Sequence, residues 1–443
     1  MIAIGGIIGA GLFVGSSTAI ATAGPAVIVS YAIAGVMILM IMRMLSEMAT
    51  LTPSTGSFTE LIRAGLGDAA GFVSGWLYWF FWVVVVAIEA IAGAVILHAW
   101  LLFEVWQIGT VLLAMMTIVN LLSARSYGEF EFWLSSAKVA AIVAFIVIAG
   151  AWALGVTSPA GPTFGNLVDH GGFAPKGWAV VLAGVTSVIF ALCGAEIATI
   201  AAAESNEPAG TIARMTASVA VRILLFYVVS IALIVSVLPW TEVVAGKSPF
   251  ASALAVMNIP GAATIMNLVV LIAVTSCLNS GMYVTSRILF VLAAREDAPR
   301  CLVKVNSRGV PVRATLIGSL FGYCALAASV LSPQLVFSFL VNASGATMLI
   351  IYLMVCGAQI RLRRRAEAEA PEKLTLRMWL FPYVSIATGL AILLVLVAML
   401  FEPGLREQLL MSLLVTMIVA AAWAILRRPR LRAMAHDKLQ EAR

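Results

Sequence analysis

The sequence has 443 residues, of which 62% are hydrophobic and 11% are charged, with a formal net charge of +6. Soluble domains contain about 45–50% apolar and about 25% charged residues, so this composition is typical of an integral membrane protein. It excludes a nucleic-acid-binding protein, a secreted disulfide scaffold and a soluble enzyme. The five cysteines are scattered, without a CxxC pair or a Cys/His cluster spaced for a metal such as zinc.

Apolar runs predict about 12 transmembrane helices, each long enough to cross roughly 30 Å of hydrocarbon. The predicted segments are 2–22, 26–50, 70–99, 103–122, 130–154, 177–202, 213–238, 261–294, 313–331, 335–360, 378–400 and 409–427. Twelve segments of roughly 20 residues already use about 240–260 positions, so too little chain is left for a separate soluble domain. The predicted class is an all-α integral membrane protein, with the lipid bilayer around it and no nucleic acid among its partners.

The distribution of basic residues predicts the orientation. An even number of segments puts both termini on one side, and the loops on that side carry 20 of the 27 Lys and Arg residues. The positive-inside rule therefore places both termini in the cytoplasm. We expect a basic cytoplasmic loop at 361–377, helices 11 and 12 within 378–427, and a cytoplasmic tail at 428–443. The runs Arg361–Arg365 and Arg427–Arg430 are topology determinants or bind anionic headgroups.

Two predicted helices carry glycine where a break is expected. The first contains the glycine-rich run 5–11, and the sixth contains Gly194 beside Glu196. Glycine costs roughly 1 kcal/mol per helix position relative to alanine, and unwound backbone at membrane depth persists only where it is buried or lines a cavity. These helices begin two five-helix halves, 2–154 and 177–360. Interrupted helices at matching positions predict a transporter site between inverted repeats, with close packing of small residues as the alternative.

Such breaks suit a zwitterionic amino acid. Free N–H groups at the start of the outer half of the first helix would face a carboxylate, helped by the helix dipole. Freed carbonyl groups at the break in the sixth helix would accept from an ammonium group. The pair of breaks thus holds both charged ends of an amino acid without any side-chain charge.

Several motifs resemble those of the amino acid–polyamine–organocation superfamily and, within it, the bacterial amino acid transporter family of permeases. In chain order the motifs are Gly5–Phe13 with Ala23–Pro25, Arg43–Glu47, Pro53–Phe58, Gly128–Trp133 leading to Lys138, Gly194–Ser205, Ser276–Gly281 with Ser286–Arg287, and Asp297–Pro299. Within that family the likeness is greatest to the γ-aminobutyrate (GABA) permeases. It rests on the runs Gly75–Trp79, Thr199–Ser205, Thr275–Ser280 and Leu376–Leu380.

The resemblance implies a leucine-transporter-like fold, in which residues 1–360 form a 5+5 inverted repeat that is followed by two C-terminal helices. It implies a proton-coupled symporter of the bacterial cytoplasmic membrane that imports an amino acid, with γ-aminobutyrate as the first choice. Such a protein is a transporter and not an enzyme, and it uses a proton gradient and no cofactor. Family members usually begin with a basic cytoplasmic tail, whereas this sequence starts inside the first helix.

The resemblance also assigns roles to residues around the two breaks. The substrate-binding residues are expected to be Gly9, Ala10, Gly11, Phe190, Ala191, Cys193, Gly194 and Glu196. Backbone N–H groups around Gly9, Ala10 and Gly11 would hold the substrate's carboxylate. Carbonyl groups of Phe190, Ala191 and Cys193 would hold its ammonium group. The ring of Phe190 resembles an aromatic lid over the substrate, with an apolar core ring as the alternative.

Ionisable side chains at membrane depth cost at least roughly 2.5–3.5 kcal/mol each, so each one requires a partner or a purpose. By resemblance, Lys138 is the proton-coupling residue, linking the fifth helix to the first; a permanently charged strut or a snorkelling side chain are the alternatives. Glu196 could touch the substrate's amine, cap freed backbone groups or act as a gate. Glu89 lies mid-span in the third helix, where it tunes the cavity or a proton path, or is a buried hydrogen-bonded strut.

Four further polar residues are candidates for a gate or for the cavity. Arg43 and Glu47 are four residues apart on one helix face, which predicts an intrahelical ion pair near the cytoplasmic end. Ser276 and Asn279 of the eighth helix could reach Lys138 or the cavity, with simple hydrogen bonding between helices as the alternative for each.

Other functions remain as alternatives. The same mechanism could serve another neutral or cationic amino acid, and a transporter-like amino acid sensor would have the same sequence features. An intramembrane enzyme is disfavoured, because the sequence has three histidines and lacks the HExxH and GxSxG motifs. We expect a small amino acid as the binding partner and no obligate protein partner.

Overall fold

The computed structural model describes residues 8–52, 57–122, 127–194, 196, 223–307 and 309–427. Every element in this part of the chain is a helix, which confirms the all-α prediction. Eight helical stretches in it are long and apolar enough to cross a membrane. Three shorter apolar stretches, Trp178–Leu192, Phe226–Val237 and Val312–Ala328, follow the same order as the predicted segments. Gly5, Gly6 and the predicted tail at 428–443 lie outside the described residues.

The first two predicted segments form one continuous helical stretch, Gly11–Leu51. It consists of the π-helix η1 (Gly11–Gly15), α2 (Ser16–Ala23), the short 3₁₀ turn η2 (Gly24–Ala26) and α3 (Val27–Leu51). Gly24 ends α2 with a φ of +66°, a conformation that glycine adopts without strain, and its position leaves no room for a side chain beside Pro175. Pro25 follows as the second residue of the turn, where its missing N–H is not needed.

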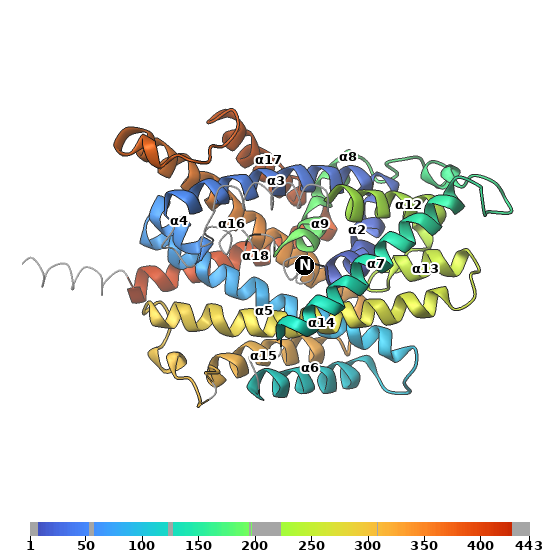
Figure 1. Ribbon diagram of the computed structural model, residues 1–443, viewed down its shortest axis with the longest axis horizontal. Coiled ribbons are helices and arrows are strands. Elements are labelled where there is room, and N and C mark those ends of the chain that lie inside the picture. Colours follow the sequence, from blue (N-terminus) through green and yellow to red (C-terminus); the bar gives the residue numbers. More distant parts are fainter. Residues whose placement is uncertain are drawn as a thin grey trace, which may run out of the picture.

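The helices α5 (Asp68–His98), α6 (Val105–Leu122), α14 (Ala262–Ala294) and α15 (Val312–Ala328) pack side by side as one layer of the bundle (Figure 1). The long helix α16 (Pro333–Glu369) packs against α5 and against α3, α4 (Phe58–Leu66) and α9 (Val185–Leu192). In the most apolar stretch of α5 and of α16, 83% of the residues are buried, against 11% in Pro403–Leu426. Helices α5 and α16 therefore form the centre of the protein.

The remaining elements complete the bundle and its connections. They are α7 (Tyr127–Ala153), η3 (Phe164–Leu167), α8 (Trp178–Ala183), η4 (Ile223–Val229), α12 (Ser230–Val237), η5 (Trp240–Glu242), α13 (Pro249–Val256), η6 (Arg300–Val303), η7 (Pro371–Lys373), α17 (Tyr383–Phe401), α18 (Pro403–Ala422) and η8 (Trp423–Arg427).

Helix α16 continues beyond residue 360 into the predicted basic loop. Two ion pairs at the (i, i+4) spacing, Arg363 with Glu367 and Arg365 with Glu369, lie along this extension. Such pairs stabilise a helix end that leaves the apolar core.

Candidate functional site

The first helix begins with an irregular segment at the centre of the bundle. Gly9 lies in a bend, and the chain enters the π-helix η1 at Gly11. A Cβ atom on Gly9 would lie 2.5 Å from Cys277 Sγ, and one on Gly11 would lie 2.6 Å from Ala191 Cα. Both glycines therefore allow close approach, to α14 and to α9 respectively. π-Helical turns of this kind are frequent at functional sites.

Helix α9 ends at the predicted break in the sixth segment. Cys193 is extended and Gly194 has a φ of +103°, which stops the helix. The fully buried Glu196 accepts hydrogen bonds from Gly194 N (2.9 Å), Tyr78 Oη (3.2 Å) and Tyr352 Oη (3.4 Å). Of the three roles predicted for Glu196, capping of the freed backbone is the one observed. Its carboxylate also joins this break to α5 and α16.

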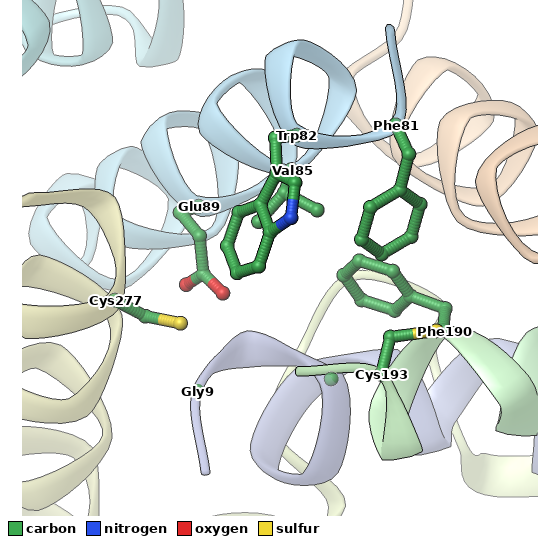
Figure 2. A pocket seen from close by; sticks show the side chains of 9 residues that line it. Gly9, Phe81, Trp82, Val85, Glu89, Phe190, Cys193 and Cys277 are labelled. Carbon is green, nitrogen blue, oxygen red and sulfur yellow. The ribbon is translucent and has the colours of Figure 1, made fainter. Parts of the chain in front are cut away.

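A narrow pocket lies between the two irregular segments and the helices α5 and α14 (Figure 2). The residues that line it are Gly9, Gly11, Phe81, Trp82, Val85, Glu89, Phe190, Cys193 and Cys277. The rings of Phe81 and Phe190 lie beside each other at one side of the pocket, and the carboxyl group of Glu89 lies at the other. The structure thus brings four of the predicted substrate-binding residues, Gly9, Gly11, Phe190 and Cys193, into one cavity.

Two backbone groups that were predicted to hold substrate already have partners. Ala10 N donates to both carboxyl oxygens of Glu89, at 3.1 and 3.2 Å, and Glu89 is only 1% exposed. The carbonyl oxygen of Ala191 accepts from Tyr227 Oη at 3.0 Å. A carbonyl oxygen has a second lone pair, whereas an N–H group has one hydrogen. The N–H of Ala10 is therefore not free, because Glu89 occupies it.

Lys138 is fully buried on α7, and its Nζ donates to Ser276 Oγ of α14 at 3.1 Å. This contact confirms that Ser276 is within reach of Lys138. Asn279 has a different partner, because its Oδ1 accepts from Asn120 Nδ2 of α6 at 2.7 Å. The alternative of a hydrogen bond between helices is thus observed for Asn279. A link from Lys138 to the first helix stays a prediction.

The predicted ion pair between Arg43 and Glu47 is wrong, because each side chain has another partner. Arg43 donates to the carbonyl oxygen of Arg377 at 2.8 Å and stacks on the ring of Trp379. The fully buried Glu47 pairs with Arg363 Nη1 at 2.7 Å.

Glu47 has two further donors, Gln359 Nε2 at 2.8 Å and the backbone N–H of Met378. We call Glu47, Gln359, Arg363 and Met378 the Glu47 cluster. A buried carboxylate needs several donors, and the end of α16 supplies them better than one neighbour along its own helix.

Sequence reasoning missed four pocket residues: Phe81, Trp82 and Val85 of α5, and Cys277 of α14. A signal was present in α5, since Trp82, Val85 and Glu89 follow the i, i+3, i+7 spacing of one helix face. The residues between them are also apolar, so no polar face marks where the pocket lies.

These features define a class: a multi-pass helical membrane protein with a buried pocket between the bend that precedes η1 and the end of α9. Residues 1–441 match the amino acid permease family, and the chain belongs to that family. Its members are transporters and not enzymes.

Similar relatives include the γ-aminobutyric acid permeases of Bacillus subtilis (strain 168) and Escherichia coli (strain K12). The first is 45% identical over 97% of this chain and 92% of the relative, and the second is 43% identical over 96% and 92%. The aromatic amino acid transport protein AroP of Corynebacterium glutamicum is 38% identical over 92% of this chain and 89% of its own length.

Proposed function

We propose that this protein is a proton-coupled symporter that imports γ-aminobutyrate across the cytoplasmic membrane. The observation that carries the proposal is a pocket that joins both helix breaks and contains a carboxyl group and aromatic rings. The names of two relatives at 43–45% identity supply the substrate. The similarity to AroP makes another amino acid the second candidate for the same site.

The proposal includes an architecture of 12 spans with both termini in the cytoplasm. Residues 2–154 and 177–360 would form the inverted repeats, and the helices near the C-terminus would lie outside them. Two irregular positions support this scheme, since a bend at Gly9 precedes η1 in the first proposed half and α9 ends before Gly194 in the second.

Lys138 is the proposed coupling residue. Its ammonium group is fully buried and contacts Ser276 of a neighbouring helix, so its protonation state affects how α7 and α14 are joined. Coupling requires that proton and substrate favour the same conformational state, which is a statement about linked free energies. No cofactor enters this scheme, because the proton gradient supplies the energy.

The remaining predicted residues keep proposed roles at this site. Gly9, Gly11, Phe190 and Cys193 line the pocket, with Ala10 and Ala191 beside them. Gly194 and Glu196 shape the break in the sixth segment, and alternating access would move the broken helices against the rest of the bundle.

The test of this function is uptake of radiolabelled γ-aminobutyrate into proteoliposomes in sodium-free buffer. An inward proton gradient should stimulate uptake, and unlabelled short ω-amino acids should compete best. If another amino acid inhibits this uptake more strongly than short ω-amino acids do, the assigned substrate changes and the proposed mechanism stands. Uptake that does not depend on the proton gradient would contradict the proposed proton coupling.

The variant Lys138→Ala tests the coupling residue. We expect accumulation against a gradient to be lost, while exchange of labelled for unlabelled substrate, which needs no net proton movement, persists. Lys247→Ala, at an exposed lysine, is the matched control and should transport like the unmodified protein. If Lys138→Ala still accumulates substrate against its gradient, Lys138 is not the coupling residue.

A further inference from the structure

One face of α16 changes from apolar to basic where the helix leaves the core. Leu353 is 36% exposed, Gly357 and Ile360 are partly exposed, and Arg361 and Arg364 are exposed. Their spacing, i, i+4, i+7, i+8 and i+11, places all five on one side of an α-helix. We call these five residues the α16 stripe.

The two arginines of the stripe lie at the height of the lipid headgroups. Residues 333–360 of α16 contain no charged side chain. At 1.5 Å per residue they extend over about 40 Å, which is close to the thickness of a bilayer with its headgroup layers. Arg361 is the first charged residue after this run. Its neighbour Arg363 contacts the ring of Phe381, two residues after the exposed Trp379, and exposed tryptophans are typical of a membrane interface.

Arg361 and Arg364 differ from the other arginines at this end of α16. Arg363 and Arg365 each pair with carboxylate groups of the protein, and these pairs use both acidic residues of the helix extension. In the part of the chain that the structure describes, Arg361 and Arg364 have no hydrogen-bond or ion-pair partner. The stripe therefore carries two uncompensated positive charges beside an apolar surface.

These two features together indicate the chemistry of a ligand. A guanidinium group can bind two phosphate oxygens at once, and two such groups lie about one turn apart on the stripe. The apolar part of the stripe continues directly from them into the membrane. A small soluble anion would use the arginines alone, whereas a phosphate joined to an acyl chain would use the whole stripe.

We propose that the α16 stripe binds an anionic phospholipid such as phosphatidylglycerol. Its phosphate lies between Arg361 and Arg364, and an acyl chain lies along Leu353, Gly357 and Ile360. In the proposed orientation this lipid belongs to the cytoplasmic leaflet. The inference goes beyond the proposed function, because it does not depend on which substrate is transported.

The test is binding of phosphatidylglycerol and of phosphatidylcholine to the purified full chain in neutral detergent, followed by native mass spectrometry. Unmodified protein should bind phosphatidylglycerol more tightly. A basic residue beside an anionic headgroup contributes about fivefold to binding, so Arg361→Gln with Arg364→Gln should weaken phosphatidylglycerol binding by about 25-fold. Binding of phosphatidylcholine, which has no net charge, should stay the same.

Arg300→Gln with Lys304→Gln is the matched control. Arg300 and Lys304 are exposed and lie in another predicted cytoplasmic loop, so this variant loses the same net charge away from the stripe. It should bind phosphatidylglycerol like the unmodified protein. An equal loss of binding in the control would show a general effect of surface charge and overturn the inference. Equal affinity of the unmodified protein for both lipids would also overturn it.

Two further measurements keep the inference testable if the glutamine variant fails to fold. Arg361→Lys with Arg364→Lys keeps both charges and loses the paired phosphate contacts, so it should bind phosphatidylglycerol more weakly than the unmodified protein. An unchanged affinity would overturn the assignment of the phosphate to these arginines. Glycerol phosphate, which has no acyl chain, should not displace the lipid at equal concentration. Displacement would show a site for soluble phosphates and overturn the assignment to a lipid.

The uptake assay separates this inference from the proposed function. Absence of γ-aminobutyrate uptake by the unmodified protein would overturn the proposed function alone. Absence of selective phosphatidylglycerol binding would overturn the lipid site alone.

Discussion

Two buried carboxyl groups, Glu47 and Glu89, lie in the same bundle and are held in different ways. Glu47 is 0% exposed and accepts from the guanidinium of Arg363, from Gln359 and from the N–H of Met378. Glu89 is 1% exposed and accepts from the N–H of Ala10. The thiol of Cys277 also donates to Glu89, and the ammonium group of Lys138 lies near enough to attract its charge.

The difference separates a carboxylate that is held by a direct ion pair from one that is held by neutral donors and lines the pocket. The Glu47 carboxylate, with three donors that include a guanidinium group, joins α3 to α16 through a buried ion pair. Glu89 faces the pocket and accepts from two neutral donors, the N–H of Ala10 and the thiol of Cys277. Removal of the charge should therefore change the free energy of unfolding much more at Glu47 than at Glu89.

The largest expected effect is on stability, from Glu47→Gln. Removing the charge leaves Arg363 buried without its main anionic partner, and breaking a buried pair costs roughly 3–5 kcal/mol in the free energy of unfolding. Glu89→Gln keeps an acceptor for Ala10 N–H and should change the same quantity by less than about 1 kcal/mol. Unfolding of both variants in mixed micelles, followed by circular dichroism, measures the contrast.

A control uses the other partner of Arg363. Glu367 is 47% exposed and pairs with Arg363 Nε at 2.8 Å. Exposed pairs contribute about 0–1 kcal/mol, so Glu367→Gln should have little effect on stability. Similar losses in Glu47→Gln and Glu89→Gln would show that the two carboxyl groups do not differ in the way described.

The second-largest effect is expected at the pocket, where η1 and α9 approach each other closely. In Gly11→Ala the new Cβ would meet the backbone of α9 at 2.6 Å, so η1 and α9 must separate. Overpacking of this kind costs about 1–3 kcal/mol, and we expect uptake to fall by about tenfold or more.

Gly150→Ala provides the matched substitution in α7, where an added Cβ meets no atom within 4 Å. It should leave uptake unchanged and gain up to about 1 kcal/mol of helix stability. Full activity of Gly11→Ala in the uptake assay would argue against a site built on this close approach.

The smallest effect concerns the pair formed by Asn120 and Asn279, a neutral contact between helices away from both carboxyl groups. Hydrogen bonds between membrane helices contribute about 0.6 kcal/mol on average, so Asn279→Ala should lower the free energy of unfolding by about that amount. The double variant with Asn120→Ala should lose little more than the single one. Strictly additive losses would contradict a direct contribution from this hydrogen bond.

The sequence by itself determined the class, the family and the helical stretches. Long apolar runs cannot be satisfied in lipid by any structure except a helix or a closed barrel, so their number and order already specify a bundle. Irregular backbone at Gly9 and Gly194 was also predictable, because glycine in an apolar helix is unfavourable unless the backbone needs the freedom. Motif order was enough to identify the permease family.

Tertiary structure alone decided which polar groups meet. Glu47 pairs with Arg363, which is distant in sequence, and not with the neighbouring Arg43. Glu89 accepts from the N–H of Ala10, which was predicted to be free. Trp82 lines the pocket although its immediate neighbours along α5 are all apolar and give no sign of it. Lipid and protein core are both apolar, so a membrane helix carries no pattern that tells its inner face from its outer one. Contacts between distant helices must therefore come from packing in three dimensions.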